Sequence, residues 1–149
     1  KQLKSKAMSE SEVIKKVDKI IKRLIEEYQP TIMAIERPFF PQSQSSPLLK
    51  EIIGRIKLIG KRRTRKIYSF APPEVKNYLC QSRKANKMDV ERIIVSQYYP
   101  WLYRRYEKDL EKVKRGQWWK RKYYTPLFDA IALGIYCYQK EVGRKKIGS

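Results

Sequence analysis

The chain has 149 residues, which suits a single domain, and 42% of them are hydrophobic, which is enough to build a core. Lys and Arg number 35 against 15 Asp and Glu, so the formal net charge is +20. A charge of this size favours binding to a polyanion, most often nucleic acid. No stretch is long and apolar enough to span a bilayer and no leader peptide is recognisable, so we expect no membrane association.

The sequence has no histidine, and its two cysteines, Cys80 and Cys137, lie far apart. Catalysis by Ser-His-Asp or Cys-His groups is therefore excluded, and a structural zinc site is disfavoured. We expect both cysteines to be free, buried thiols in a reducing compartment. If the protein is an enzyme, its chemistry must come from carboxylates, lysines and metal ions.

Alternating helical and strand patterns predict an α/β fold. The clearest helix begins at a capping box, in which Glu12 follows Ser9 by three residues, and its apolar residues recur at helical spacing. The predicted helices cover 9–28, 47–59, 73–80, 88–99 and 126–140, and the predicted strands cover 31–36 and 67–70. We predict that residues 1–149 form one domain, with a basic, aromatic insertion around 101–124.

The first predicted strand ends in a carboxylate. Four apolar residues, 32–35, run without a polar break and then meet Glu36. Such a run predicts a strand buried on both faces, as in parallel sheets. Open α/β sheets place ligands at the carboxyl ends of their strands, where a carboxylate needs a cation or a metal as partner. A surface glutamate that simply ends a core strand is an equal alternative.

Two aromatic segments are candidates for contact with bases. Phe39 and Phe40, in the proline-rich loop 37–47, would either stack on bases or cover the edge of the core. Between 101 and 124, aromatic residues interleave with Lys and Arg, which suits stacking on bases and contact with phosphates. The alternative is an amphipathic helix whose aromatic residues pack inward, followed by a basic turn. The strongest candidates in this segment are Trp118, Trp119, Lys120, Arg121 and Lys122.

The last predicted helix carries an acidic residue near its start. Thr125 suits the N-cap, Pro126 suits the first helical position, and Asp129 then falls in the first turn. The helix dipole alone favours an acid there, so a purely structural role competes with a functional one.

Several motifs occur in a fixed order along the chain. They are Ala-Ile-Glu at 34–36 with an aromatic loop, Pro-x-x-Val-Lys at 72–76, Ala-x-Lys-x-x-Val at 85–90, and Asp-Ala-Ile-Ala at 129–132. This ordered set resembles RuvC, the bacterial Holliday-junction resolvases, and their organellar relatives in the RNase H-like superfamily. The resemblance implies an RNase H-like α/β fold, with a mixed central sheet flanked by helices. It also implies a homodimeric, Mg²⁺-dependent endonuclease acting on branched DNA, in the cytoplasm near the nucleoid or in an organelle.

The same resemblance implies roles for individual residues. Glu36 and Asp129 match two metal-binding, catalytic carboxylates, with Mg²⁺ as cofactor and Mn²⁺ as a substitute. Lys87 looks like the lysine that assists at the scissile phosphate. The residues predicted to contact DNA are Phe39, Phe40, Lys76, Arg83, Lys84, Lys87, Trp118, Trp119, Lys120, Arg121 and Lys122.

Two departures from the family pattern bear on activity. The family begins with strands that carry a first aspartate in a pattern like Ile-Asp-x-Gly, which this sequence lacks, and Pro126 stands where the family often has Asp or His. We therefore expect either that a segment with the first strands precedes this sequence, or that the protein is an inactive nucleic-acid-binding module. A third alternative is a nuclease of the same superfamily that acts on an RNA–DNA hybrid or on processed RNA.

Overall fold

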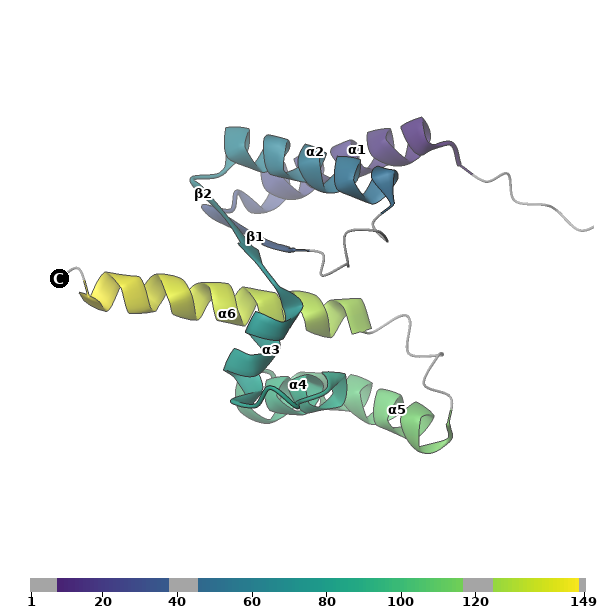
Figure 1. Ribbon diagram of the computed structural model, residues 1–149, viewed down its shortest axis with the longest axis vertical. Helices are drawn as coiled ribbons and strands as arrows, with labels where there is room; N and C mark the ends of the chain where they lie inside the picture. Colours follow the sequence, from purple (N-terminus) through teal and green to yellow (C-terminus); the bar gives the residue numbers. More distant parts are fainter. Residues whose placement is uncertain (1–7, 38–45, 117–124, 148–149) are drawn as a thin grey trace, which may run out of the picture. The chain divides into compact units, whose positions relative to one another are not determined.

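The computed structural model describes residues 8–37, 46–116 and 125–147. The chain divides into two compact units, one within Lys1–Met33 and Phe39–Tyr68 and the other within Ala34–Pro38 and Ser69–Ser149. All the predicted helices and strands are present (Figure 1). Within these residues, no helix has the length and apolar character needed to cross a membrane. That the two units act as one domain stays a prediction.

The first unit begins with α1 (Glu10–Tyr28), and the capping box predicted for it is confirmed. The Ser9 hydroxyl accepts a hydrogen bond from the Glu12 backbone N–H at 3.3 Å, and the Glu12 carboxylate accepts one from the Ser9 backbone N–H at 2.7 Å. These reciprocal bonds satisfy donors that the first helical turn would otherwise leave without partners.

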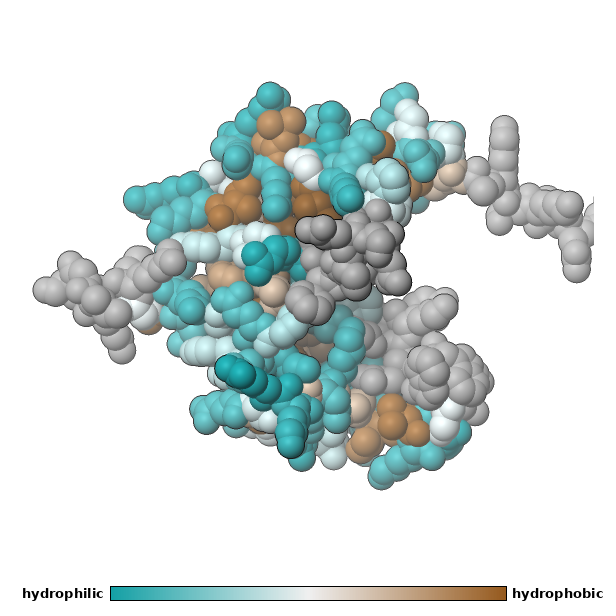
Figure 2. Space-filling view, viewed as in Figure 1, coloured by the Kyte–Doolittle hydropathy of each residue, from teal (hydrophilic) through white to brown (hydrophobic). Residues whose placement is uncertain are grey.

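The second helix of this unit, α2 (Pro47–Arg63), lies beside α1 (Figure 1). Arg55 pairs with Asp18, and Arg63 pairs with Glu26 at 2.7 Å. Both pairs join residues 37 positions apart, so the two helices run in the same direction. Figure 2 shows hydrophobic side chains gathered over α1 and α2 among charged ones.

Strands β1 (Ile32–Glu36) and β2 (Lys66–Phe70) pair with each other. The Lys66 N–H bonds the Thr31 carbonyl at 3.3 Å, and the Arg37 N–H bonds the Phe70 carbonyl at 2.7 Å. Because residue numbers rise together along both strands, the pairing is parallel. In β1, Ile32 to Ile35 are only partly buried and Glu36 is exposed. The strand is not buried on both faces as predicted, because the sheet of the described residues has two strands.

Helix α2 lies close to this sheet at Gly60. A Cβ atom there would lie 2.8 Å from Ile67 Cδ1 and 3.0 Å from Met33 Sδ, inside normal contact distance. The absence of a side chain at Gly60 therefore lets the helix backbone lie against the two strands.

The second unit is mostly helical. Its elements are α3 (Pro72–Cys80), α4 (Lys87–Ile93), the π-helix η1 (Ile94–Tyr98), the 3₁₀-helix η2 (Pro100–Leu102), α5 (Tyr103–Lys114) and α6 (Thr125–Ile147). Helix α3 contacts both α4 and α6 (Figure 1), and the buried side chains of Ile94 and Phe128 lie in its core. The helix predicted over 88–99 is present, but its second half is not α-helical, because η1 follows α4 directly and forms the last five residues of the helix as a π-helix.

The core of this unit also holds two carboxylates, Glu91 and Asp109. Lys112 Nζ lies 3.3 Å from Asp109 Oδ1, one helical turn further along α5. This pairing fits the rule that buried charges need a partner. Both cysteines are free; Cys137 is buried as predicted, whereas Cys80 is only partly buried.

Candidate active site

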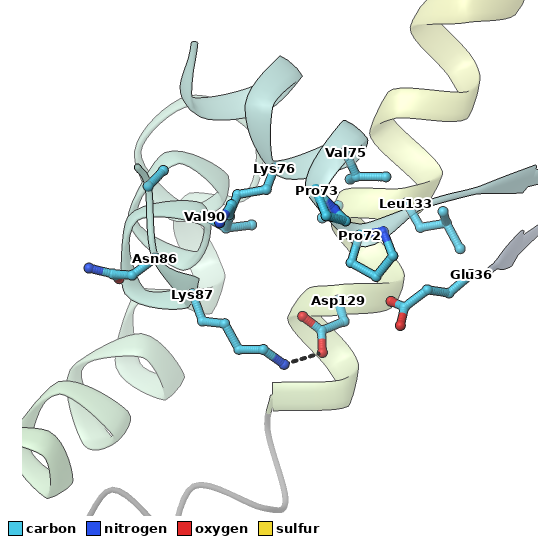
Figure 3. Close-up of a pocket in the computed structure, with 12 residues that line it drawn as sticks. Glu36, Pro72, Pro73, Val75, Lys76, Asn86, Lys87, Val90, Asp129 and Leu133 are labelled. Atoms are coloured by element: carbon cyan, nitrogen blue, oxygen red, sulfur yellow. Dashed lines mark hydrogen bonds and ion pairs between the residues drawn. The ribbon is translucent and has the colours of Figure 1, made fainter. Parts of the chain in front are cut away.

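The second unit contains a cavity of about 380 Å³ at which the ends of four elements meet. The end of β1 supplies an acid, the middle of α3 and the start of α4 supply lysines, and α6 supplies a second acid (Figure 3). Apolar side chains form the remaining wall. The lining consists of Glu36, Pro72, Pro73, Val75, Lys76, Ala85, Asn86, Lys87, Val90, Asp129, Ala132 and Leu133.

Glu36 ends β1 and points toward Asp129 (Figure 3). Glu36 is exposed to solvent, yet the pKa of its carboxyl is raised. Partial desolvation is the largest cause, the negative charge of Asp129 adds to it, and the positive charge of Lys87 opposes it. Two carboxylates from positions far apart in the sequence are therefore close enough to repel each other.

Lys87 partly balances this negative charge. Its Nζ lies 3.0 Å from Asp129 Oδ2, with 60% of the lysine side chain and 38% of the aspartate side chain exposed. Because α6 begins at Thr125, Asp129 lies just beyond the first turn, one position later than predicted. The helix dipole acts mainly within the first turn, so it gives a weaker explanation for this acid than the sequence suggested.

A second capping box places Lys87 at the start of α4. The Asn86 side-chain carbonyl accepts hydrogen bonds from the backbone N–H groups of Met88, at 2.7 Å, and Asp89, at 3.2 Å. In return, Asp89 accepts the Asn86 backbone N–H at 2.8 Å. This capping box was not predicted from the sequence, although Asn86 followed three residues later by Asp89 is a signal for one.

Helix α3 is held against α6 by a tyrosine. Tyr136, seven residues after Asp129, donates a hydrogen bond to Glu74 Oε1 at 2.6 Å. The rings of Phe70 and Tyr78 pack against the same tyrosine, with centroids 4.8 and 4.9 Å from its own. Because Glu74 follows Pro73 directly, this bond fixes the wall of the cavity relative to Asp129. No motif in the sequence pointed to Tyr136.

The other predicted DNA-contacting residues are less closely grouped. Lys76 lines the cavity but extends away from the two carboxylates (Figure 3). Arg83 and Lys84 are exposed in the turn before α4, where Lys84 and Arg92 line a second hollow of about 340 Å³. The positions Phe39, Phe40, Trp118, Trp119, Lys120, Arg121 and Lys122 lie outside the described residues.

The donor set suits a hard divalent cation. Mg²⁺ is commonly bound by one or two carboxylates, with water and substrate phosphates completing its coordination. The described residues contain no cluster of three or more His, Cys, Asp or Glu side chains placed to hold a metal. Glu36 and Asp129 are therefore a fit for Mg²⁺ only together with substrate or water oxygens. Desolvation is the main cause of the raised pKa of Glu36, and a divalent cation would relieve the repulsion from Asp129 that adds to it.

Comparison with known proteins extends these observations. The chain has a fold similar to that in the "Thermus thermophilus RuvC structure", with a TM-score of 0.53 and 18% sequence identity. The match covers 61% of this chain and 55% of that one, so the chain spans little more than half the length of this relative. A family model described as "Crossover junction endodeoxyribonuclease RuvC" matches residues 2–98, which include Glu36 and Lys87 but not Asp129. Because this match spans more than half of the sequence, the chain belongs to the RuvC family.

Proposed function

We propose that this protein is a Mg²⁺-dependent endonuclease that resolves four-way DNA junctions by hydrolysing phosphodiester bonds. The observation that carries the proposal is the convergence of Glu36 and Asp129 in one cavity beside Lys87. Family membership supports the substrate class, because the family is described as a crossover junction endodeoxyribonuclease. The net charge of +20 supports binding to the DNA backbone.

In this proposal, Glu36 and Asp129 hold Mg²⁺, for which Mn²⁺ can substitute. When bound, the metal supplies an activated water and neutralises charge on the phosphate oxygens. Lys87 contributes a mobile ammonium group. Its exposed ion pair with Asp129 is worth only about 0–1 kcal/mol, so the ammonium can move to a phosphate oxygen at little cost. The expected products carry a 5′-phosphate and a 3′-hydroxyl.

The apolar wall of the cavity has a separate role. Pro72, Val75 and Leu133 exclude water from one side of the two carboxylates (Figure 3). Charges interact more strongly where less water surrounds them, so this wall strengthens the attraction between the carboxylates and a cation. Through its bond to Glu74, Tyr136 holds this wall in place and acts as a positioning residue.

The proposal includes an assembly and a location. Two copies related by a two-fold axis would present two such sites to the two symmetric strands of a junction. Such an enzyme would work where chromosomal DNA lies, in the cytoplasm near the nucleoid or in an organelle. These statements are inferred from the proposed substrate.

Cleavage of a labelled four-way junction in Mg²⁺ tests the proposal. We expect Glu36→Gln and Asp129→Asn to lower the cleavage rate by roughly 100-fold or more, while junction binding is retained. Lys87→Met should lower the rate by a similar factor through loss of the ammonium group. Glu27→Gln is the matched control, because it removes the same charge as Glu36→Gln from an exposed position on α1.

Thermal unfolding gives a second readout that does not depend on activity. A ligand that binds only the folded state raises its stability, so Mg²⁺ should raise the melting temperature of the wild type and not that of Glu36→Gln. Tight junction binding by the full-length wild-type protein, with neither cleavage nor a response to Mg²⁺, would contradict the proposed nuclease activity.

One alternative has an observation in its favour. The described residues bring only two carboxylates to the cavity, which fits a nucleic-acid-binding module without nuclease activity. Binding without cleavage would support this module. Preferential cleavage of an RNA–DNA hybrid would instead point to another nuclease of the superfamily.

A further inference from the structure

A pair of aromatic residues, exposed Trp101 and partly buried Tyr99, follows the π-helix of the second unit. Trp101 is 73% exposed, the highest value among the large hydrophobic residues of the described chain. The Tyr99 ring meets it edge to face, with centroids 5.0 Å apart and planes at 78°. We call these two residues the Tyr99–Trp101 platform. A single exposed ring needs no partner, but two aromatic rings in contact at one corner of the backbone offer a larger apolar surface to a ligand.

The backbone holds the platform in place without burying it. The Tyr99 N–H bonds the Ile94 carbonyl at 2.7 Å, which closes the last turn of η1. The Leu102 N–H bonds the Tyr99 carbonyl at 3.0 Å, and Pro100 between them fixes its own backbone angle. Isolated π-helical turns are uncommon and are often found at functional sites. The rings are therefore presented on a stiff corner before any partner binds.

Cations accompany the platform on the next helix. Arg104 and Lys108 are both exposed and, being four residues apart, lie on one ridge of α5. Two exposed acids lie on the same helix, Glu107 and Glu111, and Glu111 is paired with Arg115 at 3.8 Å. Leu102, the aliphatic residue between the platform and α5, is partly buried. The exposed residues from 101 to 108 are therefore two aromatic residues, three basic residues and the acid Glu107, so the surface is aromatic with a net positive charge.

We propose that the Tyr99–Trp101 platform stacks against unpaired bases of a nucleic-acid strand, with Arg104 and Lys108 contacting its phosphates. Aromatic faces with cations between them bind single strands in this way without strong sequence preference. The positive charge of the chain favours a nucleic-acid partner over a protein with an apolar surface.

This surface lies just beyond residues 2–98, which match the RuvC family model. The match to the family model therefore assigns no role to this surface, and the proposal rests on its own geometry and charge. Stacking needs neither a metal ion nor cleavage, so the proposal stands apart from the nuclease reaction and can fail or succeed independently of it.

Titration of a single-stranded oligonucleotide that carries 2-aminopurine tests the platform, in EDTA so that no cleavage occurs. Stacking quenches 2-aminopurine, and anisotropy of the same oligonucleotide reports its affinity. Since base–aromatic stacking is substantial, we expect Trp101→Ala to weaken binding by roughly tenfold or more and to remove most of the quenching. Tyr138→Ala, at a residue of α6 that is 67% exposed, is the matched control and should change neither signal.

Two further variants separate stacking from burial of an apolar side chain. Trp101→Phe should keep most of the affinity and the quenching, whereas Trp101→Leu should behave like Trp101→Ala. Equal affinity of Trp101→Leu and the wild type would overturn the proposal, as would unchanged quenching in Trp101→Ala. A shift of Trp101→Ala from dimer to monomer in light scattering, with oligonucleotide binding intact, would assign the surface to a second copy and overturn it as well.

Discussion

At the scale of single residues, the ionised carboxylate of Glu36 lowers the stability of the folded state. Its raised pKa means that the folded state holds this proton more tightly than the unfolded chain does. Ionisation of Glu36 therefore reduces stability as the pH rises from its ordinary value of 4.5 through the raised pKa. Desolvation is the main cause of this shift and the negative charge of Asp129 adds to it, as expected where two carboxylates are arranged to share a cation.

Glu36→Gln should remove this penalty. We expect its free energy of unfolding at pH 7 to exceed that of the wild type by less than about 1 kcal/mol, because solvent screens an exposed carboxyl. At pH 4 and below, where the wild-type carboxyl is mostly protonated, the difference should shrink toward zero. Urea denaturation without divalent cations measures it, with Glu27→Gln as control. A loss of stability at pH 7 would show that Glu36 makes a favourable contact in the folded state.

The residues of the candidate site differ in how far the sequence could predict them. Glu36 and Lys87 fall in the part of the sequence that matches the family, and the motif order drew attention to Asp129. The bond between Tyr136 and Glu74 could not be predicted, because no pattern marks two residues 62 positions apart as partners. The exposure of Trp101 could not be predicted either, because an aromatic residue at helical spacing is as consistent with a buried position as with an exposed one.

At the scale of elements, the contact between α3 and α6 depends on the Tyr136 hydroxyl. Burial is the main reason that the pKa of Tyr136 is raised, and its hydrogen bond to Glu74 adds to the shift. The folded state therefore resists losing this proton. The contact should weaken once the pH exceeds the ordinary tyrosine value of 10.0, because the unfolded chain then ionises more readily than the folded one.

Tyr136→Phe separates the hydroxyl from the ring. We expect it to lower the free energy of unfolding by about 1 kcal/mol at neutral pH, the usual net worth of a hydrogen bond, while the ring contacts remain. The difference in free energy of unfolding between this variant and the wild type should narrow between pH 10 and 11.5. In that range only the wild type is destabilised by ionisation of Tyr136 in the unfolded chain. Denaturation in urea at each pH measures this, and Tyr138→Phe removes an exposed hydroxyl from the same helix as control. A constant difference across this range would show that the hydroxyl does not titrate with unfolding.

The bounds of most elements follow from local signals, and the exceptions come from packing or from hydrogen-bond register. The capping box at Ser9 and the prolines near the starts of α2 and α3 fixed where those helices begin. The π-helix η1 was missed because its apolar residues are spaced much as in an α-helix, and only the bond from Tyr99 to Ile94 reveals it. The close approach at Gly60 depends on Ile67 and Met33, which lie in two different strands.

At the scale of the whole molecule, net charge is the property that the sequence establishes most directly. A charge of +20 predicts that binding to any nucleic acid releases many counterions and weakens steeply with salt. If the protein neutralises about six phosphates, its affinity for a four-way junction should fall by roughly 1,000-fold between 50 and 200 mM salt. A shallow dependence would mean that most of these charges point away from the DNA.

A matched pair of double variants can then show which basic residues contact the phosphates of DNA. Arg83→Ala with Lys84→Ala removes two exposed charges from the turn before α4, next to the candidate active site. Because each neutralised phosphate contributes about 0.9 to the slope of log affinity against log salt, this double variant should reduce the slope by about 1.8. Lys15→Ala with Lys16→Ala removes the same charge from the exposed face of α1. If the turn before α4 contacts the phosphate backbone and α1 does not, only the first pair changes the slope. Equal changes for both pairs would mean that the basic surface attracts DNA as a diffuse field, without a defined path for the strand past Lys87.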